Sequence, residues 1–126
     1  MTQRILIVDD HRMSRLATER ILERLGYEVV GVGDGREAVD AEATGGFDAV
    51  LMDCQMPGMD GFQATAEIRR REVERGSART PIVGLSARAM EGDSDAALAK
   101  GMDGYLTKPL SVQELRAALQ RWVLPA

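Results

Sequence analysis

The chain has 126 residues, of which 44% are hydrophobic and 29% are charged, and its formal net charge is -4 at pH 7. This size and composition are typical of one soluble globular domain whose core needs no disulfide. The acidic balance argues against direct nucleic-acid binding, because such binding depends on clustered positive charge. A basic run at residues 69–71 is flanked by Glu67, Glu72 and Glu74, so we interpret it as a solvated helix face.

The sequence also indicates the compartment in which we expect the protein. No apolar run approaches the roughly 18 residues of a membrane span, and Met1 precedes a short apolar segment that does not resemble a signal peptide. The single cysteine, Cys54, has no partner for an internal disulfide. We therefore expect one domain over residues 1–126, in a reducing compartment such as the cytoplasm, with no membrane span.

Strand-like and helix-like segments alternate five times along the chain. In the first half we predict strands at 5–8, 27–32 and 48–53, with helices at 11–25 and from about 34 to just before 45. In the second half we predict strands at 82–86 and 104–108. We also predict three helices there: one that begins near residue 60, one that ends at residue 101, and one that spans residues 111–122. Gly26 is expected to stop the first helix, and Ser111 with Glu114 predicts a capping box for the last.

Strands that alternate with helices form a parallel sheet with right-handed crossover connections. Five such strands fit an α/β, flavodoxin-like, doubly wound sheet with strand order 2-1-3-4-5 and helices on both faces, an order taken from known folds of this kind. Ligands bind such sheets beyond the carboxyl ends of the strands. The residues at those ends are therefore the first candidates for a functional site.

Charged residues end three of the predicted strands. Asp9 and Asp10 follow the first strand, Asp53 ends the third, and Lys108 ends the fifth. Three carboxylates brought together repel one another unless a cation lies among them, and Mg²⁺ prefers oxygen ligands. Asp10 could instead act as a solvated helix cap. The pattern favours a hard-cation site beside a lysine that binds an anion such as a phosphoryl group.

Asp53 is the candidate nucleophile, since a carboxylate can attack phosphorus to form an acyl phosphate. Such a transfer depends on positioning and on neutralising the phosphoryl oxygens, which Mg²⁺ could do on one side and Lys108 on the other. Ser86 ends the fourth predicted strand and could donate its hydroxyl to a third oxygen, although a serine there is also routine. Pro109 restricts Lys108 to an extended conformation and can adopt the cis form.

Two longer stretches carry a family resemblance. Residues 53–61 have the sequence DCQMPGMDG, and residues 101–109 have the sequence GMDGYLTKP. Together with Asp9 and Asp10, these motifs make the chain resemble a response-regulator receiver domain from Arg4 to Trp122. In its amino-acid sequence, the chain resembles the receivers of hybrid sensor histidine kinases more than it resembles stand-alone regulators.

The resemblance implies a two-component or phosphorelay protein. Asp53 would accept phosphate from a histidine kinase or a histidine phosphotransfer protein, and Ser86 and Lys108 would contact the phosphoryl group. Tyr105 resembles the switch aromatic that turns inward when Ser86 moves toward phosphate, although a half-buried sheet aromatic would also suit its position. The switch would reshape a protein-binding face and so control a downstream protein target.

The resemblance also implies a metal site and two modulating positions. Asp9, Asp10 and Asp53 would hold Mg²⁺ or Mn²⁺, with the backbone carbonyl of Gln55 as a further ligand. Gln55 and Arg88 occupy positions that modulate phosphate hydrolysis in this family. We predict that Arg88 slows the loss of phosphate by blocking the approach of water.

Three residues depart from the family pattern or need an account. His11 follows the acidic pair, where the family more often has asparagine or serine. A solvated first-turn side chain is the simpler interpretation of His11, and an approach to the metal is the alternative. Gly84 lies within the fourth predicted strand, where alanine is common, and Cys54 is predicted to belong to the core.

A hypothesis of another class uses the same residues. A Mg²⁺-dependent phosphohydrolase of small phosphate esters would also form an aspartyl phosphate. Such enzymes usually have a second aspartate two residues after the nucleophile, where this chain has Gln55, and a substrate cap for which no insertion here is long enough. We therefore expect a regulatory phosphoacceptor rather than an enzyme, without an output domain, either standing alone or belonging to a hybrid kinase.

Overall fold

The computed structural model describes residues 3–86, 101–108 and 110–123. The elements in chain order are β1 (Arg4–Val8), α1 (Arg12–Arg24), β2 (Glu28–Val32), α2 (Gly35–Ala43), β3 (Ala49–Asp53), α3 (Gly61–Arg75), β4 (Ile82–Ser86), β5 (Gly104–Thr107) and α5 (Val112–Trp122). Arg88, Pro109 and the body of the helix predicted to end at 101 lie outside the described residues. Within the described ranges, no helix has the length and apolar character that crossing a membrane requires.

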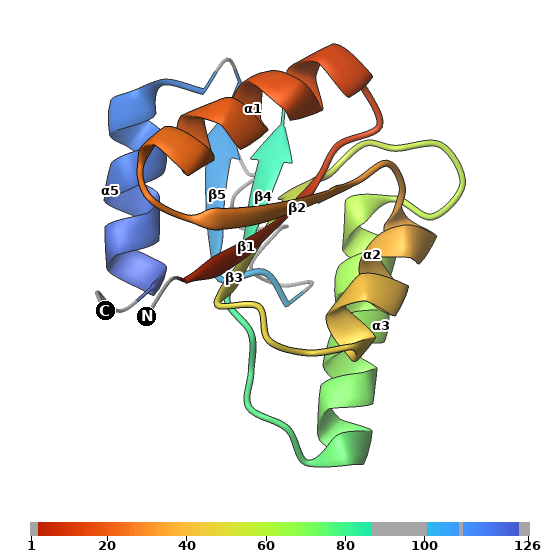
Figure 1. The fold of residues 1–126 in the computed structure, drawn as a ribbon. Coiled ribbons are helices and arrows are strands. Elements are labelled where there is room, and N and C mark those ends of the chain that lie inside the picture. Colours follow the sequence, from red (N-terminus) through yellow and green to blue (C-terminus); the bar gives the residue numbers. More distant parts are fainter. Residues whose placement is uncertain (1–2, 87–100, 109, 124–126) are drawn as a thin grey trace.

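Five parallel strands form one sheet in the order β2-β1-β3-β4-β5. Helices α1 and α5 cover one face of the sheet, and α2 and α3 cover the other (Figure 1). The predicted fold class is therefore confirmed. The chain runs outward from β1 to β2 and then returns to β3 on the other side of β1. This reversal of strand order places the switch point, where such folds bind ligands, at the carboxyl ends of β1 and β3.

Side chains of the central strands alternate between two apolar layers. Ile5 and Ile7 belong to the layer that includes residues of α1 and α5, whereas Leu6 and Val8 belong to the layer that includes residues of α2 and α3. Strands β3 and β4 are buried along their whole length. This is the pattern of a parallel sheet covered on both faces, in which charged side chains are displaced to the strand ends.

Helix termini follow ordinary capping chemistry, with one unexpected capping box. At the start of α3, the Asp60 carboxylate accepts from the Gln63 amide, and the Gln63 side chain accepts in return from the Asp60 amide. The same helix ends at Gly76, which has the left-handed conformation (φ 64°). At α5, Ser111 accepts from the Glu114 amide as predicted, but the Glu114 carboxylate accepts from the Ser111 hydroxyl, so the predicted box is half formed.

The interpretation of residues 69–71 as a solvated face is wrong for Arg69. Its side chain is only 14% exposed, and it pairs with Glu72 at 2.9 Å and with Asp103 at 2.7 Å. Arg70 is 54% exposed and pairs with glutamates of its own helix, so the interpretation is right there. The difference arises because α3 packs one side of this run against the segment that precedes β5, which a local pattern does not reveal.

Gly84 makes room for two sulfur-containing side chains. A Cβ atom built on Gly84 would lie 2.5 Å from Met102 Sδ and 3.2 Å from Cys54 Sγ. Met102 and Cys54 are both buried in the layer beneath α2 and α3. The glycine in this strand is therefore explained by close packing, and the predicted core position of Cys54 is observed.

Candidate functional site

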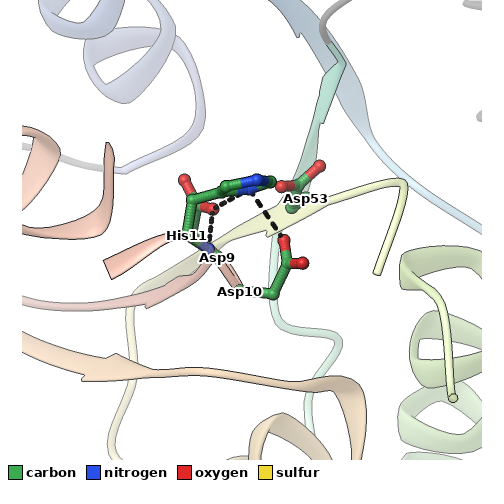
Figure 2. A group of neighbouring side chains, drawn as sticks. All are labelled: Asp9, Asp10, His11 and Asp53. Carbon is green, nitrogen blue, oxygen red and sulfur yellow. Dashed lines mark hydrogen bonds and ion pairs between the residues drawn. The ribbon is translucent and has the colours of Figure 1, made fainter. Parts of the chain in front are cut away.

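The carboxyl ends of β1 and β3 bring three carboxylates together. The parallel register of these strands places Asp9 and Asp53 side by side, and both are buried, at 1% and 6% exposure. Asp10 lies next to them and is partly exposed. One ligand atom from each of Asp9, Asp10, Asp53 and His11 lies within 4.8 Å of the others. Figure 2 shows these four side chains gathered at the strand ends. The predicted convergence of the acidic strand ends is therefore observed.

Lys108 reaches these carboxylates from the end of β5. Its backbone N–H donates to the carbonyl of Ser86 at 2.7 Å, which holds the residue beside the end of β4. Its Nζ lies 2.9 Å from Asp9 Oδ2 and 3.2 Å from Asp53 Oδ2. The ammonium group thus bridges two buried carboxylates that belong to different strands.

The ionisation of Asp9 and Lys108 is set by this bridge. Burial acts to raise the pKa of Asp9, but hydrogen bonds from Ser14, from the His11 amide and from Lys108 outweigh it and lower the pKa. Burial acts to lower the pKa of Lys108, but its hydrogen bonds with Asp9 and Asp53 and their charges outweigh it and raise the pKa. Both groups are therefore charged at neutral pH.

Asp53 is in a different electrostatic position. Burial raises its pKa, and the Lys108 ammonium and the Gln55 amide offset only part of that effect, while the charge of Asp9 adds to it. The Gln55 amide donates to Asp53 Oδ1 at 3.3 Å. The folded protein thus holds the ionised form of Asp53 at an energetic cost, which a further positive charge would reduce.

The start of α3 closes tightly over the end of β3. The Gly61 amide donates to the Cys54 carbonyl at 3.2 Å, and a Cβ atom on Gly61 would lie 2.2 Å from the Asp53 carbonyl oxygen. Only glycine fits at such a backbone approach. This contact fixes both ends of the loop at residues 54–60, which carries Gln55 beside the carboxylates.

Ser86 and Tyr105 lie where the sequence analysis placed them. Ser86 is the last residue of β4, is 5% exposed, and pairs in register with Thr107. Tyr105 lies in β5 opposite Gly84 and is partly buried against the layer beneath α2 and α3. Ser86 therefore lies between the acidic cluster and β5, and Tyr105 lies on β5 itself, the edge strand of the sheet.

His11 is exposed, as expected, but it does not lie in the first turn of the helix. It is the N-cap of α1, and its side chain makes no capping hydrogen bond. The side chain is 78% exposed, yet Nδ1 lies 3.3 Å from Asp10 Oδ1 and 3.9 Å from Asp9 Oδ1. In Figure 2 the imidazole ring faces the carboxylates. The ring is therefore part of the cluster.

Two residues of α1 that the sequence analysis did not single out also support Asp9. Ser14 hydrogen-bonds its carboxylate, and Arg15 Nη1 donates to its backbone carbonyl at 2.9 Å. Both lie in the first turn of α1 after the acidic pair. Their position offered a weak signal, because polar residues in a first helical turn are common.

The residues present fit a divalent cation. Asp10 Oδ1 is buried and has no hydrogen-bond partner, although His11 Nδ1 lies 3.3 Å away. The described cluster contains three carboxylates and one lysine, so negative charge exceeds positive charge. A hard cation binds oxygen ligands and neutralises excess negative charge. A carboxylate oxygen without a hydrogen-bond partner, in a cluster with excess negative charge, suits such a cation.

The sheet topology and this acidic cluster define an α/β domain with a candidate cation site at the carboxyl ends of β1 and β3. The sequence profile described as the response regulator receiver domain matches residues 5–120, and the chain belongs to that family. It is 48% identical over 119 residues to "Sensor protein GacS" of Pseudomonas syringae pv. syringae. That match covers 94% of this chain and 13% of the relative, so the chain spans about an eighth of the GacS length.

Solved structures of similar domains agree with the assignment. The receiver domain of sensor histidine kinase PA1611 from Pseudomonas aeruginosa PAO1, described with a magnesium ion coordinated in its active-site cleft, is 43% identical. Its TM-score is 0.86, and the match covers 97% of this chain and 98% of that one. A co-crystal structure of Saccharomyces cerevisiae Ypd1, a histidine phosphotransfer protein, with the Ssk1 receiver domain gives 29% identity and a TM-score of 0.92, covering 97% and 89%.

Proposed function

We propose that Asp53 accepts the phosphoryl group in a two-component or phosphorelay pathway. The donor is a phosphohistidine of a sensor histidine kinase or of a histidine phosphotransfer protein. A new bond forms between an Asp53 carboxylate oxygen and phosphorus, the N–P bond of phosphohistidine breaks, and the imidazole leaves. The observation that carries this proposal is the position of Asp53, a buried carboxylate that contacts Lys108 at 3.2 Å in a cluster with excess negative charge.

The proposed metal ligands are Asp9, Asp10, Asp53 and the backbone carbonyl of Gln55, which would hold Mg²⁺ or Mn²⁺. Bound there, the cation would neutralise phosphoryl oxygens during the transfer. The oxygen donor set and the unpartnered Asp10 Oδ1 support this assignment. The magnesium ion named for the PA1611 receiver domain supports it by relation.

Lys108 and Ser86 are the proposed partners of the phosphoryl oxygens. Lys108 Nζ bridges Asp9 and Asp53, so it stands beside the attacking oxygen before the phosphate arrives. Ser86 ends the strand between β3 and β5, and its movement toward phosphate would leave space for Tyr105 to turn inward. Pro109 would restrict Lys108 to an extended conformation, and Arg88 would slow hydrolysis by shielding the acyl phosphate.

The proposed cellular role is regulatory. Residues 1–126 would act as a single receiver domain, in which phosphorylation changes a face that binds a downstream protein. The chain is similar to one short segment of two much longer GacS sensor kinases. This similarity supports an origin in, or a likeness to, a hybrid sensor kinase. A cytoplasmic location, contact with a kinase or phosphotransfer protein, and no direct contact with nucleic acid complete the proposal.

The test is intact-mass spectrometry after incubation with phosphoramidate or acetyl phosphate, with and without Mg²⁺. The wild-type protein gains one phosphoryl group only with Mg²⁺, whereas Asp53→Asn gains none. Asp40→Asn is the matched control, because Asp40 is an exposed α2 carboxylate, 62% exposed, outside the acidic cluster. It behaves as wild type. Equal labelling of wild type and Asp53→Asn would refute the proposal.

The hydrolase alternative makes a different prediction, which a phosphate-release assay tests. A phosphohydrolase would release many equivalents of inorganic phosphate from a small phosphate ester such as p-nitrophenyl phosphate. The proposed receiver releases none from such an ester above a protein-free control. Multiple turnover that disappears in Asp53→Asn would establish the enzyme and displace the regulatory proposal.

A further inference from the structure

His11 has an unusual role for a residue that begins a helix. Its backbone is firmly held, because its N–H donates to Asp9 Oδ1 at 2.9 Å and its carbonyl accepts from Arg15 N–H at 2.9 Å. An N-cap side chain normally accepts from an amide of the first turn, and the His11 side chain does not. The imidazole is therefore positioned by the backbone for some purpose other than capping.

The ring nitrogen faces the carboxylate oxygens of the cluster (Figure 2). Nδ1 lies 3.3 Å from Asp10 Oδ1 and 3.9 Å from Asp9 Oδ1. Asp10 Oδ1 nevertheless has no hydrogen-bond partner, so the short separation from Nδ1 is not a hydrogen bond in this arrangement. Two atoms with lone pairs that face one region without bonding each other are arranged as ligands of a common cation.

The spacing of these atoms suits a small divalent cation. In an octahedral site with bonds of about 2.0–2.1 Å, adjacent ligand atoms lie about 3 Å apart and opposite ones about 4 Å apart. The Nδ1 distances to the two aspartates fall within this range. All four ligand atoms, including that of Asp53, lie within 4.8 Å of one another. A small contraction would therefore complete coordination by one nitrogen and three oxygens.

We propose that His11 is a further metal ligand, which makes this site selective for divalent transition-metal ions over Mg²⁺. Imidazole binds Co²⁺, Ni²⁺ and Zn²⁺ well, whereas Mg²⁺ prefers oxygen donors. Nitrogen ligation therefore adds affinity for the transition metals and almost none for Mg²⁺. The proposal rests on the metal site of the proposed function and extends it to the choice of metal.

The first test is calorimetric titration of tag-free protein with Mg²⁺ and with Co²⁺ or Ni²⁺. His11→Asn is expected to weaken Co²⁺ and Ni²⁺ binding by about tenfold or more and to change Mg²⁺ binding by about twofold or less. Met13→Asn is the matched control, because Met13 lies in the first turn of α1 and is 78% exposed. It leaves both affinities unchanged. An unchanged ratio of Co²⁺ to Mg²⁺ affinity in His11→Asn would overturn the proposal.

The second test detects the nitrogen ligand directly. The chain contains a single histidine, so any imidazole nitrogen coordinated to a bound metal belongs to His11. Pulsed electron paramagnetic resonance of the Mn²⁺-loaded or Cu²⁺-loaded protein is expected to show imidazole nitrogen coupling that is lost in His11→Asn. Metal bound without that coupling overturns the role of His11 alone. Failure of wild-type protein to bind any divalent cation overturns this proposal and the proposed metal site together.

Discussion

The two ends of the sheet both contain buried carboxylates, but they balance the charge differently. At the amino end, carboxylates and guanidinium groups are matched in the described residues. They belong to Glu42, Glu72, Asp103, Arg69, Arg75 and Arg79. At the carboxyl end, three carboxylates have one lysine. The comparison teaches that buried carboxylates with full sets of partners hold the fold together, whereas an undercompensated group marks a site for a cation.

The amino-end network is satisfied by backbone groups as well as by arginines. Asp103 Oδ2 accepts from the Ile82 amide at 2.9 Å and from Arg69 at 2.7 Å. Glu72 Oε2 accepts from the Thr80 amide at 2.8 Å. These bonds join α3 to the starts of β4 and β5. The network therefore holds the first residues of β4 and β5 in place, while the carboxyl ends of these two strands lie near the acidic cluster.

Breaking the amino-end network is expected to have the largest effect. Arg69→Met leaves the Glu72 and Asp103 carboxylates without the buried guanidinium that joins them and lowers the free energy of unfolding by about 3–5 kcal/mol. Urea unfolding measures the change. Arg70→Met is the matched control, because Arg70 is exposed and its pairs with Glu67 and Glu74 are worth under about 1 kcal/mol. Equal losses in the two variants would show that the buried network has no special weight.

Adding a cation to the carboxyl end is expected to have the next largest effect. Mg²⁺ at about 100 times its dissociation constant raises the free energy of unfolding of the wild-type protein by about 2.7 kcal/mol. Lys108→Met removes the one lysine of the cluster, so it lowers stability without metal and tightens Mg²⁺ binding, because the cation no longer shares the carboxylates. The measurement is urea unfolding across a Mg²⁺ titration. A weaker Mg²⁺ response in Lys108→Met would contradict the account.

Removing a negative charge from the carboxyl end is expected to have the smallest effect and, unlike Arg69→Met, to raise the free energy of unfolding. The raised pKa of Asp53 means that its ionised form costs stability in the folded state at neutral pH, above that pKa. Asp53→Asn therefore raises the free energy of unfolding in metal-free buffer. It also weakens Mg²⁺ binding. Destabilisation by this substitution in metal-free buffer would argue against charge repulsion in the cluster.

The two ends also differ in how well the sequence predicts them. The carboxyl end was predictable, because apolar runs that end in Asp9, Asp53 and Lys108 must emerge together once the sheet is parallel. The amino-end network was not, because Arg69 and Asp103 are 34 residues apart and share no motif. The direction of the His11 ring was not predictable either, since it depends on how the backbone turns into α1.

Gly84 illustrates the same limit on prediction within the core. Its position inside a strand was evident from the pattern, but its cause, the approach of Met102 and Cys54, depends on packing between strands and across a layer. The periodicity of apolar residues and the composition of a segment specify which face of the sheet or helix a residue occupies. They do not specify which distant side chain meets it there.

The central claim is that one of the clustered carboxylates, Asp53, takes the phosphoryl group. After phosphorylation with phosphoramidate and Mg²⁺, borohydride reduces an acyl phosphate of aspartate to homoserine, and peptide mass spectrometry locates the product. The account predicts homoserine at position 53 only, and none in a sample without Mg²⁺. Homoserine at Asp9 or Asp10, or at Asp60, the N-cap of α3, would contradict it.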